Sequence, residues 1–316
     1  MKIVFCGTPQ FAVPTLEAIL AAGHSVPLVV SQPDRPVGRD RVLTAPPVKQ
    51  CAQQHGIPVI QPEKIKNNQE FRSQLEAIAP DAIVVVAYGR IVPPWMLALP
   101  RHGCINLHAS LLPKYRGAAP IQWAVAMGDA VTGNTTMLLE EGLDTGPILL
   151  QQSLPIPPTA TAADMFLALA EQGAPLLVET LAGLNAGTLH PQAQDHTQAT
   201  LAPILTRDDA QMDFATRSAQ QLYDRWRGFQ PWPGAWTTLH GKKLIVHSMA
   251  VVDAAAISAP AHAAPALLHL NQGKLYAAGA QSTWLELIEI QLEGKKRMLA
   301  ADFLRGTQLA ADTRLG

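Results

Sequence analysis

The sequence predicts an α/β domain with a mostly parallel, Rossmann-like sheet, followed by a smaller all-β domain of the OB-like barrel type. Three observations support this prediction. The chain has 316 residues, more than one hydrophobic core usually holds. Short apolar runs alternate with helical patterns in its first half. Its last third contains mainly short apolar runs separated by turn residues.

The alternation is clearest in the first hundred residues. Four short runs are expected to be buried strands: Lys2–Cys6, Val26–Ser31, Val59–Ile60 and Asp81–Ala87. Helical spacing covers Val13–Ala22 and Phe71–Ala79, and Gly23 and Pro80 stop these helices. The first segments therefore form βαβ units.

The pattern continues to about residue 189. Three further strands are expected, the last two as a hairpin-like pair: Gly103–Leu107, Thr135–Leu139 and Ile148–Ile156. Ala162–Leu184 has helical spacing, which Gly173 and Pro175 are expected to interrupt. Residues 1–189 are therefore assigned to the first domain.

A polar, aperiodic stretch at residues 190–206 is typical of a linker. After it, Thr216–Arg227 has helical spacing. Short strands are expected at Lys243–His247, Lys274–Ala277 and Thr283–Ile290. The short strands predict a small β-barrel over residues 207–316.

Composition is that of a folded globular protein, with 48% apolar and 16% charged residues. The longest apolar runs are too short to cross a bilayer, and the apolar start ends at Gly7 before a signal peptide could form. Three scattered cysteines in no C-x-x-C pair argue against disulfides and a zinc site. We therefore expect a cytoplasmic protein with no metal and no membrane partner.

Charge is distributed unevenly, although the net charge is only −1. Residues 1–116 carry 12 basic and 7 acidic residues, and residues 117–206 carry no basic and 8 acidic ones. Residues 207–316 carry 12 basic and 10 acidic ones. A polyanionic partner would therefore contact the first and last thirds of the chain. Ordinary uneven surface charge is the alternative explanation.

Several common activities lack their motif in this chain. The first turn contains no G-x-G-x-x-G, and Thr8-Pro9 blocks the close approach of a pyrophosphate, which argues against a nicotinamide or flavin cofactor. The sequence has no G-x-x-x-x-G-K-[ST], H-E-x-x-H or G-x-S-x-G motif either. Nucleotide hydrolysis, zinc proteolysis and serine-hydrolase chemistry therefore lose their usual support.

Asn106 and His108 stand two residues apart at the end of a predicted strand, so their side chains point to the same face. Ligands bind at the carboxyl ends of strands in open α/β sheets. An amide and an imidazole directed at one point can stabilise an oxyanion, and the imidazole can also transfer a proton. Asp144, in a glycine-flanked loop, could orient that imidazole. A structural histidine and an aspartate that braces its own turn are the alternatives, and spacing alone does not decide between them.

These residues resemble the signature of the formyltetrahydrofolate-dependent formyltransferases. The signature residues are Asn106, His108, Ser110–Pro113, Arg116–Gly117 and Leu143–Gly146. Longer stretches are similar to the branch of the family that acts on charged initiator tRNA: Phe5–Ala12, Gln32–Arg39, Val85–Gly89, Gly117–Trp123, Arg227–Ala235 and Gly294–Met298. The resemblance covers nearly the whole chain.

The resemblance implies that a monomer moves the formyl group of 10-formyltetrahydrofolate to the amino group of methionyl-initiator tRNA. Asn106 and protonated His108 would bind the formyl oxygen, and Asp144 would hold His108 and help to relay protons. The residues expected to bind the folate, largely through their backbone, are Ser110, Leu111, Leu112, Pro113, Tyr88 and Gly89. Core packing is the alternative for the side chains of the two leucines.

The resemblance also implies two surfaces for the tRNA. One is a loop from Gln32 to Val48 with Arg39 and Arg41, although Gly38–Val42 is less rich in lysine than the family version. A merely solvated loop is the alternative. The second surface is the barrel, with these basic residues: Arg225, Arg227, Lys242, Lys243, Lys295, Lys296 and Arg297.

Three competing functions remain at this point: a folate-dependent N-formyltransferase for an amino sugar, a formyltetrahydrofolate hydrolase, and an inactive tRNA-binding protein. The basic loop and barrel favour tRNA over a sugar, and the complete Asn106, His108 and Asp144 set favours an enzyme. Trp226, Trp232 and Trp236 are interpreted as packing residues and not as base-stacking ones.

Overall fold

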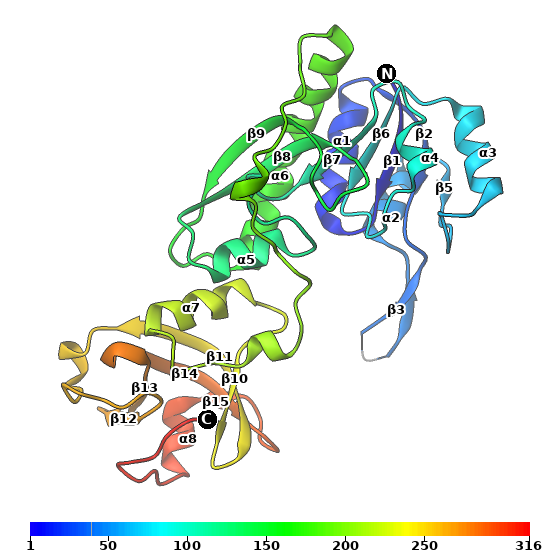
Figure 1. Ribbon diagram of the computed structural model, residues 1–316. Coiled ribbons are helices and arrows are strands. Elements are labelled where there is room, and N and C mark those ends of the chain that lie inside the picture. Colours follow the sequence, from blue (N-terminus) through cyan, green and yellow to red (C-terminus); the bar gives the residue numbers. More distant parts are fainter. Residues whose placement is uncertain (39) are drawn as a thin grey trace. The chain divides into compact units, whose positions relative to one another are not determined.

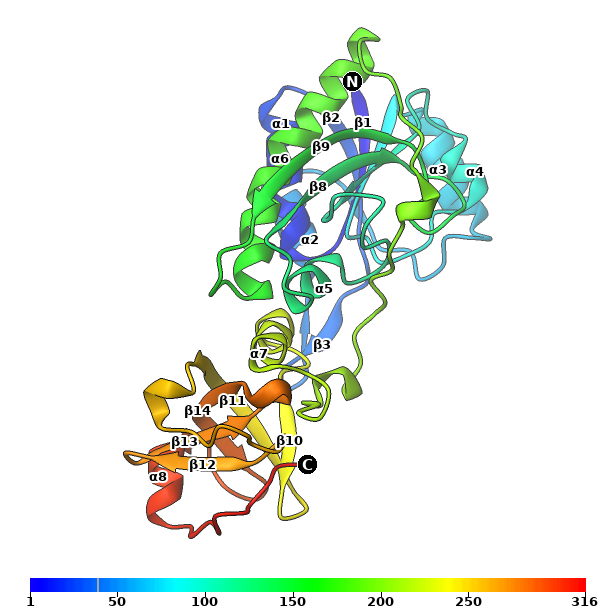
Figure 2. The same ribbon diagram turned by 60° about the vertical axis from the view of Figure 1, so that its left-hand side comes forward.

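The structure is a computed structural model that describes residues 1–38 and 40–316. The chain divides into two compact units, which Figures 1 and 2 show coloured along the sequence. The first unit comprises residues 1–120, 131–155 and 164–203. The second comprises residues 121–130, 156–163 and 204–316, so two short segments from the middle of the chain group with the C-terminal part.

The first unit is built on a seven-stranded sheet with the order β5-β2-β1-β6-β7-β8-β9. Its strands are β1 (Lys2–Gly7), β2 (Ser25–Val30), β5 (Val59–Ile60), β6 (Ala82–Val86), β7 (Cys104–His108), β8 (Val131–Leu138) and β9 (Ile148–Pro155). Neighbouring strands from β5 to β7 are parallel, and β8 and β9 run antiparallel to their neighbours. The predicted mostly parallel α/β sheet is thus confirmed.

Helices cover both faces of this sheet. They are α1 (Val13–Ala21), α2 (Pro47–Gln54), α3 (Gln69–Ile78), α4 (Pro94–Leu97) and α6 (Ala162–Ala186). In Figure 2, α1 and α6 lie on the opposite side of the sheet from α3 and α4. Alternate residues of β6 serve the two sides: Ile83 and Val85 pack in one cluster with Phe71 and Leu75 of α3. All of β6 is buried, which explains its continuous apolar run.

Helix α6 runs without a break through Gly173 and Pro175, so the predicted interruption is wrong. Packing outweighs the local cost of these residues: a Cβ atom at Gly173 would lie 2.7 Å from Leu107 Cδ2, so glycine allows close contact with β7. The hydroxyls of Thr136 and Thr180 also bond α6 to β8 at 2.8 Å. By length and composition alone, α6 is the one helix among the described residues that could cross a membrane, and half of its apolar stretch is buried.

The segment predicted as a loop from Gln32 to Val48 contains an antiparallel pair, β3 (Arg35–Val37) and β4 (Val42–Thr44), and leads into α2. The ladder is only three residues long and includes Pro36, so the sequence pattern does not reveal it. Leu43 is 68% exposed, which places an apolar side chain in solvent on this hairpin.

The second unit is an antiparallel sheet with the order β10-β11-β14-β13-β12 and with β15 beside β14. Its strands are β10 (Trp236–Leu239), β11 (Lys242–Val252), β12 (Leu268–Asn271), β13 (Lys274–Ala278), β14 (Trp284–Leu292) and β15 (Met298–Leu299). The last residues join the two ends of this sheet. The amide of Gly316 bonds to the Thr238 carbonyl of β10 at 3.0 Å, and the amide of Leu268 in β12 bonds to the Thr313 carbonyl at 2.9 Å. The sheet therefore curls into the small barrel that the sequence predicted.

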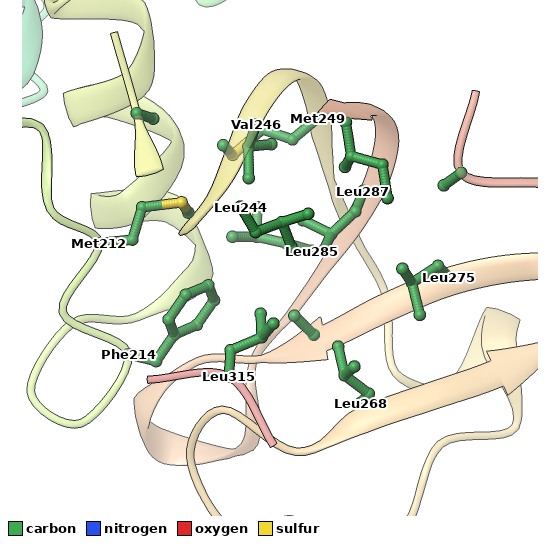
Figure 3. Packing of buried hydrophobic residues seen from close by; sticks show 14 of the residues in the cluster. Met212, Phe214, Leu244, Val246, Met249, Leu268, Leu275, Leu285, Leu287 and Leu315 are labelled. Atoms are coloured by element: carbon green, nitrogen blue, oxygen red, sulfur yellow. The ribbon is translucent and has the colours of Figure 1, made fainter. Parts of the chain in front are cut away.

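Inside the barrel, leucines and other apolar residues from facing strands form one core (Figure 3). Leu244 and Leu285 are fully buried, and Leu315 from the tail points into the same core at 5% exposure. Phe214, which precedes the strands, packs in it as well. The tail thus contributes to both the backbone ladder and the core.

The other α-helices of the described residues are α5 (Pro120–Ala126), α7 (Ala219–Gly228) and α8 (Ala300–Arg305). Helix α7 begins at a Ser218–Gln221 capping box. Trp226 of α7 stacks on Tyr223 at 5.6 Å between ring centroids. Trp236 donates from Nε1 to the Arg207 carbonyl. Trp232 is 53% exposed, so the packing interpretation is wrong for that residue.

Candidate active site

The order of strands in the large sheet reverses between β1 and β6, because the chain continues from β1 to β2 and from β6 to β7 in opposite directions. Such a reversal leaves a crevice at the carboxyl ends of the strands. Here Thr8 Oγ1 and Gln32 Nε2 both donate to the Tyr88 carbonyl at 3.1 Å, which fixes the turn after β6 beside the turn after β1. Asn106 and His108 lie in β7, and the residues expected to bind folate follow β6 and β7, next to this reversal.

Asn106 and His108 lie in β7, where Asn106 is paired with Val85 of β6 and His108 with Thr135 of β8. They are two residues apart in one strand, so they share a face of the sheet. Asn106 is 9% exposed and His108 is 6% exposed. Within the described part of the chain, the Asn106 side-chain amide has no hydrogen-bond partner. The amide atoms keep contact with solvent, so they are open to a ligand.

The two ring nitrogens of His108 have different neighbours. Nε2 lies 2.9 Å from the Tyr115 carbonyl oxygen, and because a carbonyl only accepts, Nε2 carries a proton. Nδ1 lies 3.7 Å from Asp144 Oδ2, which is within ion-pair range but longer than a hydrogen bond. Nδ1 is therefore the ring nitrogen that can exchange a proton with a reacting group. The structure brings His108 and Asp144 together, as the motif spacing alone could not establish.

Asp144 is held by the backbone of its neighbours. The amide of Gly117 donates to Asp144 Oδ2 at 2.8 Å, and Asp144 itself has a φ of 50°, a conformation rare for residues other than glycine. Two residues further, a Cβ atom at Gly146 would lie 1.9 Å from the Leu138 carbonyl oxygen. Glycine at this position allows the loop to turn back on the end of β8.

The stretch expected to bind folate is tightly bonded within the protein. Ser110 is fully buried, and its hydroxyl donates to the Lys114 carbonyl at 2.6 Å. The carbonyls of Ser110, Leu111, Leu112 and Pro113 all accept internal hydrogen bonds. Each of these carbonyl oxygens still has a second lone pair. The backbone can therefore bind a pterin through these lone pairs and through those N–H groups that have no internal partner.

At the Tyr88–Gly89 turn, the Tyr88 side chain is 2% exposed and packs in the core under the sheet, so only its backbone faces the crevice. Burial raises the pKa of the Tyr88 phenol. Gly89 has a φ of +80°, and an added Cβ atom would meet nothing within 4 Å. The turn thus leaves open space where the resemblance expects a flat ring.

The basic residues expected to bind tRNA differ in their surroundings. Arg39 lies outside the described residues. Six others are exposed: Arg41, Lys242, Lys243, Lys295, Lys296 and Arg297. Arg297 is already paired with Glu289, and the Lys243 ammonium lies 4.5 Å from the Trp236 ring centroid.

Arg227 does not belong to this surface, contrary to the prediction. It is 3% exposed, and it pairs with the buried Asp224 at 2.5 Å and donates to the Ala160 carbonyl at 2.7 Å. It holds the second unit together, which a helical basic residue does not reveal in sequence. Arg225 beside it is half-buried, with its guanidinium 4.7 Å from the Phe229 ring centroid.

Among the residues that the structure describes, one group of side chains could hold a metal ion: Glu17 of α1 and Cys51 and His55 at α2 place one ligand atom each within 4.8 Å of one another. Cys51 is buried, and this burial raises the pKa of its thiol. The negative charge of Glu17 raises it further. The sequence has no C-x-x-C pattern that would indicate this group. Cys51 and His55 are one helical turn apart, and Glu17 is distant from both in the sequence.

Sequence reasoning also missed Gln194, which lies in the stretch predicted as a linker. Its side chain is 6% exposed and bonds to Arg116 on one side and to the loop of Asp144 on the other. The stretch has no periodicity that could have signalled this position. The nearest signal in the sequence is the signature residue Arg116, because an arginine that becomes buried needs a hydrogen-bond partner. That signal does not say which residue the partner is.

Comparison with known proteins extends this picture. A family model described as formyl transferase matches residues 1–181, and one described as formyl transferase, C-terminal domain, matches residues 204–308. The chain belongs to the formyl transferase family. The resemblance predicted from the sequence is confirmed.

Relatives in this family are similar over their full length. The methionyl-tRNA formyltransferase of Acidobacterium capsulatum is 66% identical over 316 residues, which cover all of both chains. That of Koribacter versatilis is 56% identical over all of this chain and 99% of its own. With such relatives, the chain is a formyl-transferring enzyme.

Solved structures of formyltransferases share the fold at low identity. The N-formyltransferase from Helicobacter canadensis, in complex with folinic acid and dTDP-3-aminofucose, aligns with a TM-score of 0.65 and 16% identity over 91% of this chain and 98% of that one. A sugar 3N-formyl transferase, WlaRD, in the presence of dTDP and 5-N-formyl-THF, aligns with a TM-score of 0.64 and 15% identity over 94% and 99%. At this identity the likeness concerns the fold.

Proposed function

We propose that this formyltransferase transfers the formyl group of 10-formyltetrahydrofolate to the amino group of methionyl-initiator tRNA. The observation that carries the proposal is the His108–Asp144 contact beside the unpartnered amide of Asn106. The full-length relatives, which are named methionyl-tRNA formyltransferase, support the acceptor. Folate compounds in solved formyltransferases of the same fold support the donor.

In the proposed reaction the amine nitrogen attacks the formyl carbon, and the carbonyl oxygen becomes negative in the tetrahedral intermediate. The bond between the formyl carbon and N10 of the folate then breaks, and N10 takes up a proton as the amine loses one. No net oxidation or reduction occurs. The protein therefore has to stabilise an oxyanion and move a proton.

Asn106 supplies amide hydrogens to the oxyanion, since its side-chain amide has no hydrogen-bond partner among the described residues. His108 supplies Nδ1, because Nε2 is committed to the Tyr115 carbonyl. That bond also fixes the ring orientation. Removing one such oxyanion donor typically lowers turnover by about 10²–10³-fold.

Asp144 Oδ2 lies 3.7 Å from His108 Nδ1, too close for a bridging group, so a small approach of the two side chains when substrate binds brings them into hydrogen-bond range. The Gly117 amide prevents the carboxylate from turning away. We assign to Asp144 the orientation of His108 and the relay of the amine proton.

For the folate we keep the Ser110–Pro113 stretch and the Tyr88–Gly89 turn as the binding surface. Internal bonds make the stretch rigid, so it can present a fixed edge to a pterin, and Gly89 leaves room for the ring. A folate analogue should protect the amides of this stretch from hydrogen exchange. Unchanged exchange there would place the folate elsewhere.

For the tRNA we propose the segment from Gln32 to Val48, with Arg39 and Arg41, and the barrel, with Lys242, Lys243, Lys295 and Arg297. All but Arg39, which is not described, are exposed and able to meet phosphates. Arg41→Ala and Arg39→Ala should raise the Michaelis constant for tRNA and flatten its salt dependence. We also propose domain boundaries at residues 189 and 206, a monomer, and action in the cytoplasm.

The acceptor is tested by incubating the enzyme with 10-formyltetrahydrofolate and, separately, methionyl-initiator tRNA, the uncharged tRNA, or an amino sugar nucleotide. Formylation of the charged tRNA alone is the expected result. Formylation of the sugar would reassign the substrate, and release of formate without an acceptor would indicate a hydrolase.

The catalytic roles are tested with Asn106→Ala and His108→Ala in single-turnover transfer. Both variants should bind a folate analogue with nearly normal affinity and transfer the formyl group about 10²-fold more slowly or worse. Thr180→Ser, a buried substitution on α6, outside the segments that carry the proposed catalytic residues, serves as a control for packing. Near-normal transfer by either alanine variant would refute the assignment.

A further inference from the structure

The stretch between the two family matches, residues 182–203, contains Gln194. Its side chain contacts both Arg116 and the loop that carries Asp144. We propose that Gln194 is a positioning residue for the Asp144 loop, defined here as residues 139–147 between β8 and β9. It would act through the backbone of the loop and not on the substrate. The proposal rests on the proposed function of Asp144 in formyl transfer.

Gln194 makes four hydrogen bonds. Its Nε2 donates to the carbonyl of Asp144 at 2.9 Å and to that of Gly146 at 2.7 Å. Its Oε1 accepts from Arg116 Nε at 3.1 Å and from Arg116 Nη2 at 2.6 Å. The amide thus uses both of its hydrogens and both of its acceptor sites.

The orientation of this amide is not ambiguous. A guanidinium only donates, so the oxygen of Gln194 has to face Arg116. Backbone carbonyls only accept, so the nitrogen has to face Asp144 and Gly146. No other polar side chain of the same size and neutral charge provides two donors and an acceptor in this arrangement.

The two carbonyls that Gln194 holds lie on either side of Thr145. Holding these carbonyls fixes the peptide planes on the C-terminal side of Asp144. The backbone of Asp144 has a φ of 50°, which is unfavourable for residues other than glycine and needs such support. The carboxylate then faces His108 Nδ1 and the Gly117 amide. Without Gln194, the loop loses the two hydrogen bonds that hold the backbone from which the Asp144 side chain extends.

Arg116 gives Gln194 a fixed reference point. It is 6% exposed, and a second bond joins its Nη2 to His196 Nδ1 at 3.0 Å. Its own backbone pairs with the same stretch, since its amide bonds to the Thr200 carbonyl at 2.9 Å and its carbonyl accepts from the Ala202 amide at 2.7 Å. Arg116 is adjacent to Gly117, whose amide bonds to Asp144. The pair of Arg116 and Gln194 therefore connects the Gly117 segment with the Asp144 loop.

The backbone of the stretch is attached to the Asp144 loop as well. Gln192 and Ile148 exchange two backbone hydrogen bonds of 2.8 Å at the start of β9. The side chain of Gln192 is exposed, so its substitution leaves this bridge in place. Gln192→Ala is therefore a matched control for Gln194→Ala in the same stretch.

The test compares Gln194→Ala, Gln194→Glu and Gln192→Ala in single-turnover formyl transfer and in folate-analogue binding. Gln194→Glu retains an acceptor for Arg116 but points a carboxylate oxygen at two carbonyls. A displacement of 1 Å near reacting groups can cost about 10²-fold in rate, so we expect both Gln194 variants to lose about 10- to 100-fold in kcat. Michaelis constants and analogue binding should stay near those of the wild type, and Gln192→Ala should transfer normally.

The decisive measurement is a double-mutant cycle with Asp144→Asn. If Gln194 acts through Asp144, Gln194→Ala will slow transfer strongly in the wild-type background and hardly at all in the Asp144→Asn background. Equal losses in both backgrounds would overturn the proposal, as would wild-type rates for both Gln194 variants, or the loss of a cooperative melting transition in both. Failure of the wild-type enzyme to formylate charged tRNA would instead refute the proposed function.

Discussion

Gly146 offers a direct test of how accurately the Asp144 loop has to be placed. In Gly146→Ala the new Cβ atom would lie 1.9 Å from the Leu138 carbonyl oxygen, whereas contacts of real Cβ atoms are essentially never shorter than 3.0 Å. The loop or the end of β8 therefore has to move by about 1 Å, because neither partner is a flexible side chain. This movement affects a backbone that begins two residues after Asp144.

A displacement of that size is expected to lower kcat by about 10²-fold, with little change in folate-analogue binding. The assay is single-turnover formyl transfer, with thermal unfolding as the measure of stability. Gly187→Ala is the matched control: its φ is +68° and an added Cβ atom meets nothing within 4 Å, so it should cost about 1–2 kcal/mol of stability without slowing transfer. A Gly146→Ala enzyme with kcat within about threefold of the wild type would show that Asp144 tolerates a shift of its loop.

Three further predictions concern the cores and the titrating groups. Leu315→Ala should destabilise the barrel by about 3 kcal/mol in urea unfolding, whereas Leu270→Ala, at a residue 47% exposed, should change it by less than about 0.5 kcal/mol. Asp224→Ala should cost about 3–5 kcal/mol, because it leaves the buried Arg227 guanidinium without its carboxylate, and Trp226 fluorescence would report the transition. Burial raises the pKa of Cys104 to about 12, so above about pH 9 the unfolded thiol loses its proton first. Unfolding free energy should therefore fall as pH rises beyond that point, and by less in Cys104→Ala; an equal slope in both proteins would contradict this.

The strands and helices of the sheet could be predicted because their signals are local. The apolar run at Asp81–Ala87 is continuous since β6 is buried on both faces, and Asn106 and His108 lie in the last part of β7, whose carboxyl end marks the ligand edge. Their chemical role, however, came from the family resemblance and not from spacing. The structure adds the His108–Asp144 contact, which joins residues 36 positions apart in the sequence.

The rest depends on contacts that no local pattern encodes. Gln194 bonds to a residue 78 positions away, within a stretch whose polarity resembles that of a free linker. Gly173 and Pro175 were expected to interrupt α6, but the contact with Leu107 requires a residue without a side chain. Arg227 was predicted to be on the surface, because helical spacing gives no sign of its buried partner Asp224.

Residues 313–316 join both outer strands of the barrel, and this has a consequence for handling the protein. If proteolysis removed them, the backbone groups of β10 and of the start of β12 would lose their partners at Thr238 and Leu268. Unpaired strand edges are templates for pairing between molecules. Preparations clipped at this end should thus self-associate while their helices remain intact, and light scattering would detect the damage earlier than circular dichroism.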